Sequence, residues 1–146
     1  MSPEKPLTYL LGQTVNLVKQ KLLSKFRENA IEINIEHFSM LHHINENNNL
    51  TQQDMANQFM RDKSIILRQV NALIELNYVV RETDVNDKRK KNLMLTKKGK
   101  KILADSKKLS REVSNELLDG ISEDELKDFE NIINKIQINT GYSTSN

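Results

Sequence analysis

The sequence predicts a mainly α-helical fold of the α+β class, with one short β-hairpin, for this chain of 146 residues. Apolar residues recur at helical spacing through most of the chain, which indicates amphipathic helices. The chain contains only four glycines and two prolines, so few positions force a helix to end. Residues 78–95 differ, because two short apolar runs flank a polar, charged loop there, as in a hairpin.

Two helices are predicted in the first fifty residues. The first covers about residues 6–28, and the second begins after Asn34, a favourable N-cap residue. The second ends at the run Asn47-Asn48-Asn49, whose side chains compete for backbone hydrogen bonds. The apolar stripe of the first helix consists of Leu7, Leu10, Leu11, Val15, Val18, Leu22 and Phe26.

A complete helix-start signal precedes the third helix, which is expected to end near Phe59. Thr51 is placed to cap it, and Asp54 three residues later completes a capping box. Leu50 and Met55 have the spacing of a hydrophobic staple. Residues 50–59 therefore predict a short, well-capped helix.

The fourth helix is predicted over about residues 62–76, with Asp62 as its N-cap. At about 100° per residue, Ile66, Val70 and Leu73 share one side, which is therefore the core face. Polar and basic side chains occupy the opposite side. Asn77 is then expected to adopt the left-handed conformation that ends many helices.

The C-terminal third predicts two more helices. Thr96 is expected to open a long helix that Gly120 terminates, and Ser122 with Glu125 forms a second capping box. The stripes of these helices consist of Ile102, Leu109, Val113 and Leu117, and of Leu126, Phe129, Ile133 and Ile136. One small core cannot bury this many apolar stripes, so a two-fold dimer through the terminal helices is expected.

This reading divides the chain into four parts. Residues 1–33 form an N-terminal dimerisation helix, 34–99 a winged helix-turn-helix domain, 100–139 the C-terminal dimerisation helices, and 140–146 a flexible tail. The helical dimerisation region thus comes from both termini, and the wing has two strands. A helix pair beside a basic hairpin is the arrangement that binds duplex DNA through both grooves.

The charge distribution supports the same function. The net charge is only +2, but residues 51–101 carry twelve Lys and Arg against six Asp and Glu. A charge run such as 88–91 is usually a solvated loop, although a hairpin tip beside a helix pair favours DNA contact. The candidate DNA-binding residues are Arg61, Lys63, Ser64, Ile65, Leu67, Arg68, Asn71, Asp87, Lys88, Arg89, Lys90 and Lys91.

Two segments resemble the MarR family of bacterial transcription regulators. LTQQDMANQFMRDKSIILRQVNALIELNYVVR is similar to the family's helix-turn-helix, and DVNDKRKKNLMLTKKG is similar to its wing signature. The signature residues are Asp84, Asp87, Arg89, Leu93, Leu95, Thr96 and Gly99. The resemblance implies that Arg89 enters the minor groove, that Asp87 orients it, and that Lys63, Ser64, Ile65, Leu67, Arg68 and Asn71 face the major groove.

The resemblance further implies a dimeric, ligand-responsive repressor that binds a pseudo-palindromic operator. Its effector would be a small aromatic molecule held between the dimer helices and the winged lobe, by residues that the sequence does not identify. Two departures from the family stand out. Asn77 replaces the usual Gly, and Ile65 and Leu67 replace small polar residues, so they either contact thymine methyl groups or flank the core. A dimer of this fold that binds ligands or proteins but does not read DNA is the alternative.

Other functions find little support in the sequence. His37, His42 and His43 lack the spacing and the carboxylate partners of a metal site, and no catalytic, nucleotide-binding or cofactor motif occurs. Tyr9 and Phe38 either pack in the core or line an effector pocket. The lysines at 97, 98, 100 and 101 are either solvated or add phosphate contacts. With no cysteine, no membrane span and no signal pattern, the chain is expected to be a cytoplasmic protein and not an enzyme.

Overall fold

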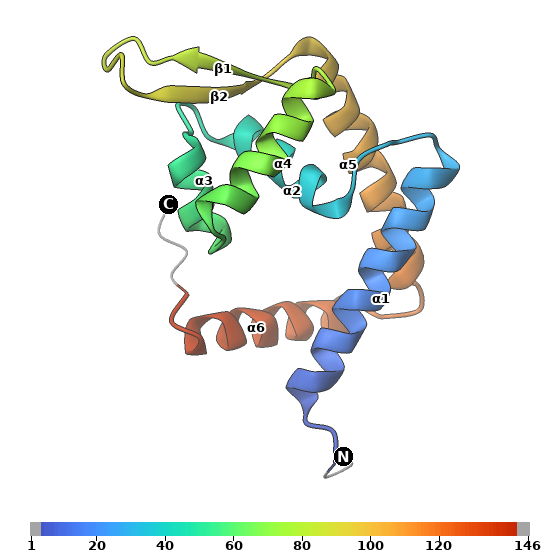
Figure 1. The fold of residues 1–146 in the computed structure, drawn as a ribbon. Helices are drawn as coiled ribbons and strands as arrows, with labels where there is room; N and C mark the ends of the chain where they lie inside the picture. Colours follow the sequence, from blue (N-terminus) through green and yellow to red (C-terminus); the bar gives the residue numbers. More distant parts are fainter. Residues whose placement is uncertain (1–3, 143–146) are drawn as a thin grey trace. The chain divides into compact units, whose positions relative to one another are not determined.

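The structure, a computed structural model, describes residues 4–142, which form six helices and one two-stranded antiparallel sheet (Figure 1). The mainly α-helical α+β fold predicted from the sequence is confirmed. The elements are α1 (Leu7–Glu28), α2 (Ile35–Glu46), α3 (Gln52–Phe59), α4 (Lys63–Glu75), β1 (Val79–Thr83), β2 (Lys91–Leu95), α5 (Lys97–Leu117) and α6 (Glu123–Asn139).

The chain divides into two compact units, one ending at Val113 and the other beginning at Ser114. The first unit contains the wing, formed by β1, β2 and their connecting turn, which extends beyond α3 and α4 (Figure 1). The second contains the end of α5 and all of α6. Most of the predicted tail, residues 143–146, lies outside the described residues.

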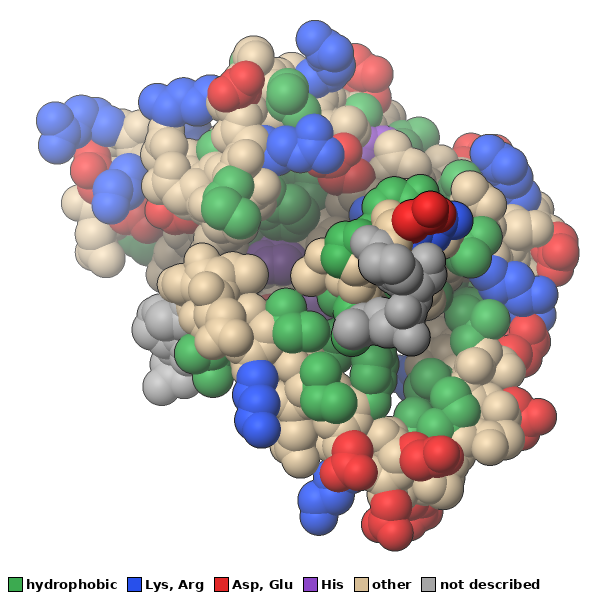
Figure 2. All heavy atoms as spheres, turned by 90° about the horizontal axis from the view of Figure 1, so that it is seen from below, with side chains coloured by type: hydrophobic (Ala, Val, Ile, Leu, Met, Phe, Trp, Pro, Cys, Tyr) green, Lys and Arg blue, Asp and Glu red, His purple; other side chains and the backbone are tan. Residues whose placement is uncertain are grey.

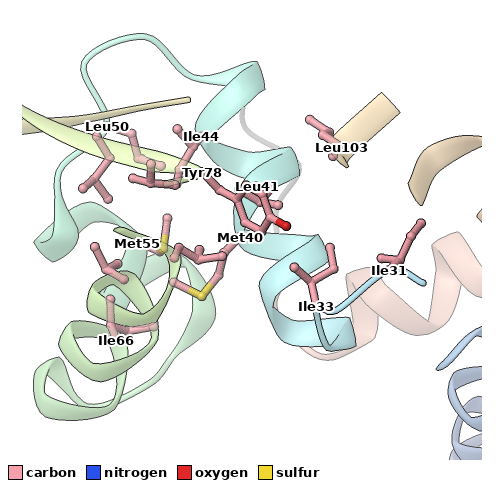
Figure 3. Packing of buried hydrophobic residues seen from close by; sticks show 14 of the residues in the cluster. Ile31, Ile33, Met40, Leu41, Ile44, Leu50, Met55, Ile66, Tyr78 and Leu103 are labelled. Carbon is pink, nitrogen blue, oxygen red and sulfur yellow. The ribbon is translucent and has the colours of Figure 1, made fainter. Parts of the chain in front are cut away.

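One apolar core holds the first unit together, and the predicted core side of α4 faces it. Ile66, Val70 and Leu73 are fully buried, as the helical spacing predicted. Figure 3 shows Met40 of α2, Met55 of α3 and Ile66 of α4 gathered in the space between these helices. Burying side chains of this size typically contributes about 1.5–3 kcal/mol each. The core therefore fixes α4 so that its other side faces outward.

The predicted caps of α2 and α3 form as expected. Asn34 accepts a hydrogen bond from the backbone N–H of His37 at 2.7 Å. Thr51 Oγ1 accepts from the backbone N–H of Asp54 at 3.1 Å, and the Asp54 carboxylate accepts from the backbone N–H of Thr51 at 3.0 Å. The capping box thus satisfies two backbone donors at the start of the helix pair.

Thr51→Ala is expected to lower the free energy of unfolding by about 1 kcal/mol, because the Asp54 N–H loses its acceptor. Urea unfolding of the full chain measures this change. Thr51→Ser is the matched control and should stay within a few tenths of a kcal/mol of the parent, since it keeps the hydroxyl. An equal loss in both variants would show that the threonine methyl group, not the cap, carries the effect.

The two ends of α4 differ from each other. Asp62 occupies the predicted N-cap position with an extended backbone, but its side chain makes no capping hydrogen bond. Among residues 4–142, no carboxylate therefore caps the first-turn N–H groups of α4. Asn77 adopts the predicted left-handed conformation, with φ of 61°.

The wing is longer than predicted and is fastened to the start of α3. β2 begins at Lys91, which pairs with Thr83, two residues before the predicted return strand. Leu93 N–H donates to the carbonyl of Leu50 at 2.8 Å, and Thr51 forms a β-bridge with Asn92. The hairpin therefore continues the backbone pairing into the segment that precedes α3.

The start of α5 lies against the backbone that leads into β1. Thr96 Oγ1 accepts from the backbone N–H of Gly99 at 2.9 Å, which confirms Thr96 as the helix opener, and it donates to the carbonyl of Asn77 at 2.6 Å. A Cβ atom built on Gly99 would lie 2.0 Å from the carbonyl oxygen of Tyr78. Only glycine allows this close approach.

Apolar side chains remain exposed in both units. In the first unit the largest set lies on α1, and in the second they lie on and before α6, where no described residue is buried. Figure 2 shows hydrophobic side chains exposed on the face seen from below. Tyr9, one of the residues assigned to core or pocket, is 53% exposed. The exposed set includes Leu7, Leu10, Val15, Leu17 and Val18, and separately Leu118, Ile121, Phe129, Ile132 and Ile138.

No helix among residues 4–142 has the length and apolar content needed to cross a bilayer.

Candidate nucleic-acid interface

The outward side of α4 carries most of the predicted major-groove residues. Lys63, Ser64, Arg68 and Asn71 are all exposed. Within the described part of the chain, the side chains of Lys63 and Arg68 make no hydrogen bond or ion pair, so their charges are available to a partner. This side of the helix therefore presents donors and positive charge to solvent.

The two apolar residues among the predicted major-groove residues, Ile65 and Leu67, differ in their exposure. Ile65 is half-buried and flanks the core side. Leu67 is 44% exposed and lies in a hollow of about 300 Å³ beside Lys63 and Ser64. The flank interpretation thus fits Ile65, whereas Leu67 belongs to the solvent-facing surface.

The turn of the wing is held by the carboxylate of Asp84. One oxygen accepts from the backbone N–H groups of Asn86 and Asp87, at 3.0 and 2.9 Å. The other accepts from the side-chain amide of Asn92, which is buried, at 2.8 Å. Three hydrogen bonds to one carboxylate therefore fix the turn and tie it to the buried Asn92.

These hydrogen bonds lower the pKa of Asp84, with the Asn92 amide as the largest cause and the two backbone N–H groups next. The stabilisation they give is present above the unfolded pKa of about 3.9 and is lost as pH falls through the lowered folded pKa. An NMR titration of the Asn86 and Asp87 amides should therefore show a midpoint below about 3.9. Asn92→Ala should move the midpoint upward; an unchanged midpoint would show that the backbone donors alone set it.

Arg89 stands at the tip of the wing with its side chain 92% exposed. The Asp87 carboxylate accepts from the Arg89 backbone N–H at 3.0 Å and from its Nε at 3.3 Å. The guanidinium keeps its remaining donors free of this contact. Lys88 and Lys90 are also exposed, while Lys91 Nζ donates to Thr83 Oγ1 at 2.8 Å across the hairpin.

The N-terminus of α3 joins the wing to the outward side of α4. Gln52 and Gln53 line a hollow of about 570 Å³ together with Arg89, Lys90 and Lys91. The same two glutamines line the smaller hollow with Lys63, Ser64 and Leu67. We call this continuous region of α3, α4 and the wing the cationic surface. Its residues are Gln52, Gln53, Lys63, Ser64, Leu67, Arg68, Asn71, Arg81, Lys88, Arg89, Lys90 and Lys91.

Arg61 is the predicted site residue most engaged with the rest of the unit. Its guanidinium pairs with Glu36 of α2 at 3.4 Å. The other Glu36 oxygen accepts from Gln69 of α4 at 3.2 Å, and Gln69 Oε1 lies 2.6 Å from Nε2 of His37. Because that amide oxygen can only accept, His37 donates from Nε2. These contacts tie α2 to α4 and hold Arg61 at the turn before α4.

Arg81 of β1 was absent from the predicted site, although it belongs to the cationic surface. Its Nε donates to the Gln52 side chain of α3, and its Nη2 donates to Asn71 Oδ1 of α4 at 2.7 Å. The sequence offered one signal, a lone arginine within a predicted short strand next to the helix pair. The bridging partners, Gln52 and Asn71, lie too far along the chain for spacing rules to pair them.

Among the described residues, no group of three His, Asp or Glu side chains is arranged to hold a metal ion. His37 and His43 are instead engaged in hydrogen bonds, the latter with the carbonyl of Ser39 at 3.0 Å.

A family model described as MarR matches residues 33–91, which include α2, α3, α4, β1 and the turn of the wing. Solved structures of the same fold include S. aureus MepR in a complex with DNA, at 23% identity and a TM-score of 0.81, covering 95% of this chain and 99% of that one. The transcriptional repressor CouR, bound to a 23-mer DNA duplex, is 23% identical with a TM-score of 0.80 and coverages of 90% and 92%. E. coli MarR in its apo form is 22% identical, with a TM-score of 0.77 and coverages of 90% and 96%.

The matched segment contains the helix pair and the turn that carries Asp84, Asp87 and Arg89, whereas the rest of the predicted wing signature, Leu93, Leu95, Thr96 and Gly99, lies beyond it. Residues 33–91 therefore match the MarR family model, and the chain as a whole has the winged helix fold of these solved structures.

Proposed function

We propose that the protein is a homodimeric, sequence-specific repressor that binds a pseudo-palindromic operator and responds to a small aromatic ligand. In this proposal residues 34–99 form the DNA-binding domain, and the helices within 1–33 and 100–139 form the dimer. Each subunit places α4 in the major groove and the wing in the adjacent minor groove.

The observation that carries this proposal is the continuity of the cationic surface. Lys63 and Arg68 on α4 and Arg89 at the wing tip belong to one unit whose core and backbone pairing fix their relative positions. A helix and a hairpin held in this way match the two grooves that a winged helix contacts. MepR and CouR, which share the fold, have both been solved with DNA bound.

The chemistry of individual residues fits this placement. A narrow minor groove concentrates negative potential, which attracts an exposed guanidinium such as that of Arg89. Leu67 offers an apolar contact for a thymine methyl group in the major groove. Lys63 lies in the first turn of α4, where it adds positive charge to the helix N-terminus that faces a phosphate.

Exposed apolar side chains support the dimer. α1 leaves Leu10, Leu17 and Val18 uncovered, and α6 leaves Phe129 and Ile132 uncovered. A second copy would cover both sets, and two-fold symmetry would set the two α4 helices about one DNA turn, 34 Å, apart. Sedimentation equilibrium should give twice the chain mass, and Phe129→Glu should shift the chain toward monomer. A stable monomer would contradict this part of the proposal.

DNA binding is tested with the full chain and a pool of random-sequence duplexes about 30 base pairs long, enough for two half-sites. Selection and sequencing should recover two inverted half-sites. Binding to the recovered duplex should fall by about 10³–10⁵-fold between 50 and 200 mM salt if six to ten phosphates are neutralised. A flat salt response with no recovered sequence would instead favour the alternative, a ligand-binding or protein-binding dimer without DNA reading.

Repression is tested by transcription in vitro from a template whose promoter overlaps the recovered site. The proposal expects transcript to fall as the protein is added, and a template with scrambled half-sites serves as the control. An increase in transcript would show that the protein activates.

A hollow within the first unit supports the ligand response. It is an open hollow of about 420 Å³ beside α1, α2 and α5, with apolar walls from Leu22, Ile35 and Phe38 and cationic groups from Arg111 and from Lys107, which also pairs with Glu46 at 3.8 Å. Such a lining suits an aromatic ring that bears an acid group. Benzoate should therefore raise the thermal midpoint of unfolding more than the neutral benzamide does. Equal shifts, or none, would contradict an acidic aromatic ligand at this place.

A further inference from the structure

Arg81 connects three elements of the cationic surface. From the third position of β1 its guanidinium donates to Gln52 at the first residue of α3 and to Asn71 in α4, the latter at 2.7 Å. Arg81 is half-buried, whereas Asn71 is exposed on the same outward side of α4 as Arg68. The arginine thus lies behind the amide groups that a partner would meet first.

The chemistry of the two partners fixes their orientation. A guanidinium carries only donors, so each amide must turn its oxygen toward Arg81 and its NH₂ group away from it. The oxygen of Asn71 keeps a second lone pair, but a donor that approached there would meet the positive guanidinium. Toward solvent, Asn71 therefore offers hydrogen-bond donors and little acceptor capacity.

We propose that Arg81 determines base specificity by positioning Asn71 to read the keto edge of guanine or thymine. Guanine O6 and N7 and thymine O4 are acceptors in the major groove, whereas the usual asparagine–adenine pair needs an amide oxygen to accept from N6. Because Asn71 Oδ1 already accepts from Arg81, it is not available to accept from adenine N6. Arg81 acts through Asn71 and is a positioning residue. The inference rests on the proposed function, because it requires α4 to lie in the major groove.

The test compares base preferences selected from the random duplex pool by the parent chain and by variants. Asn71→Ala first identifies the operator position whose preference depends on Asn71. At that position the parent should prefer G or T over A by about tenfold, the size expected from one good base contact. Arg81→Met should shift this position toward A, because the freed amide can form both adenine hydrogen bonds.

Asn71→Asp provides the converse arm. It keeps an acceptor for Arg81 but replaces the outward NH₂ group with oxygen, so the preference should move to bases with an amino group, C or A. Lys108→Met, which removes one exposed positive charge from α5, is the matched control for Arg81→Met and should change no base preference. A purely structural role for Arg81 would weaken binding to all sequences alike and leave the preferred base unchanged.

Each remaining result counts against the inference in a distinguishable way. A parent preference for A at the Asn71 position, or no position that depends on Asn71, would overturn it while leaving the proposed function intact. An unchanged G or T preference in a folded Arg81→Met variant would do the same. If that variant does not fold, the Asn71→Asp arm decides: a switch to C or A supports the inference, and no switch overturns it. If the parent selects no sequence at all, both the proposed function and the inference fail.

Discussion

Arg89→Ala is expected to weaken binding to the recovered operator by roughly 1–3 kcal/mol, as for loss of one specific groove contact. The side chain is 92% exposed, and its guanidinium forms an ion pair with Asp87 at the wing surface. Exposed ion pairs of this kind contribute little to folding. Binding should therefore fall while the thermal midpoint of unfolding stays nearly constant. Fluorescence anisotropy and calorimetry measure the two quantities.

Lys88→Ala is the matched control for Arg89→Ala, because it removes an exposed positive charge from the neighbouring position of the same turn. Its loss should be smaller and should be similar on operator and random duplex, as for a phosphate contact. A fall in the unfolding midpoint of Arg89→Ala that matched its loss of binding would assign Arg89 a structural role. Equal losses of operator binding in the two variants would show that Arg89 contributes only positive charge and no specific groove contact.

Gly99→Ala is expected to lower the free energy of unfolding by about 3 kcal/mol, the upper end of the usual cost of overpacking. The added Cβ would lie 2.0 Å from the Tyr78 carbonyl oxygen, which is backbone and cannot rotate away as a side chain would. Alanine is the better helix former by about 1 kcal/mol, but this gain is smaller than the clash. Denaturant unfolding measures the change.

Gly12→Ala in α1 is the control for Gly99→Ala. Nothing lies within 4 Å of a Cβ built on Gly12, so alanine should increase stability by about 0.5–1 kcal/mol through helix propensity alone. A loss of stability in both variants would point to a general intolerance of glycine substitution. A neutral Gly99→Ala would mean that α5 can move away from Tyr78 at little cost.

Features with local causes were predictable from the sequence. The caps at Asn34, Thr51 and Ser122 and the left-handed Asn77 depend on residues within three or four positions, and all of them form. The core side of α4 was equally predictable, because helical spacing places Ile66, Val70 and Leu73 together. The predicted wing signature included Gly99. Why glycine is needed there became clear only from the structure, in which the start of α5 lies against the backbone of Tyr78.

Features with distant partners were not predictable. Arg81 bonds to residues ten and 29 positions away, and no spacing rule connects them. β2 begins early because Lys91 and the buried Asn92 pair with Thr83 and Glu82, although a Lys-Asn pair has little strand propensity. The apolar stripes of α1 and α6 were predicted as faces to be buried. Many of these side chains are exposed in the single chain, because helical spacing predicts an apolar face but does not say which surface covers it.

The fastening of the hairpin to the segment before α3 has a consequence for regulation. Leu93 bonds to Leu50, and Arg81 links β1 to α3 and α4, so the wing and α4, the two elements that we propose contact DNA, are held as one stiff unit. A bound ligand would then change DNA affinity little by moving the wing or α4 alone. To release an operator, the ligand would have to change the distance or angle between the two DNA-binding units of the proposed dimer. Their spacing would then no longer match the helical repeat of the DNA.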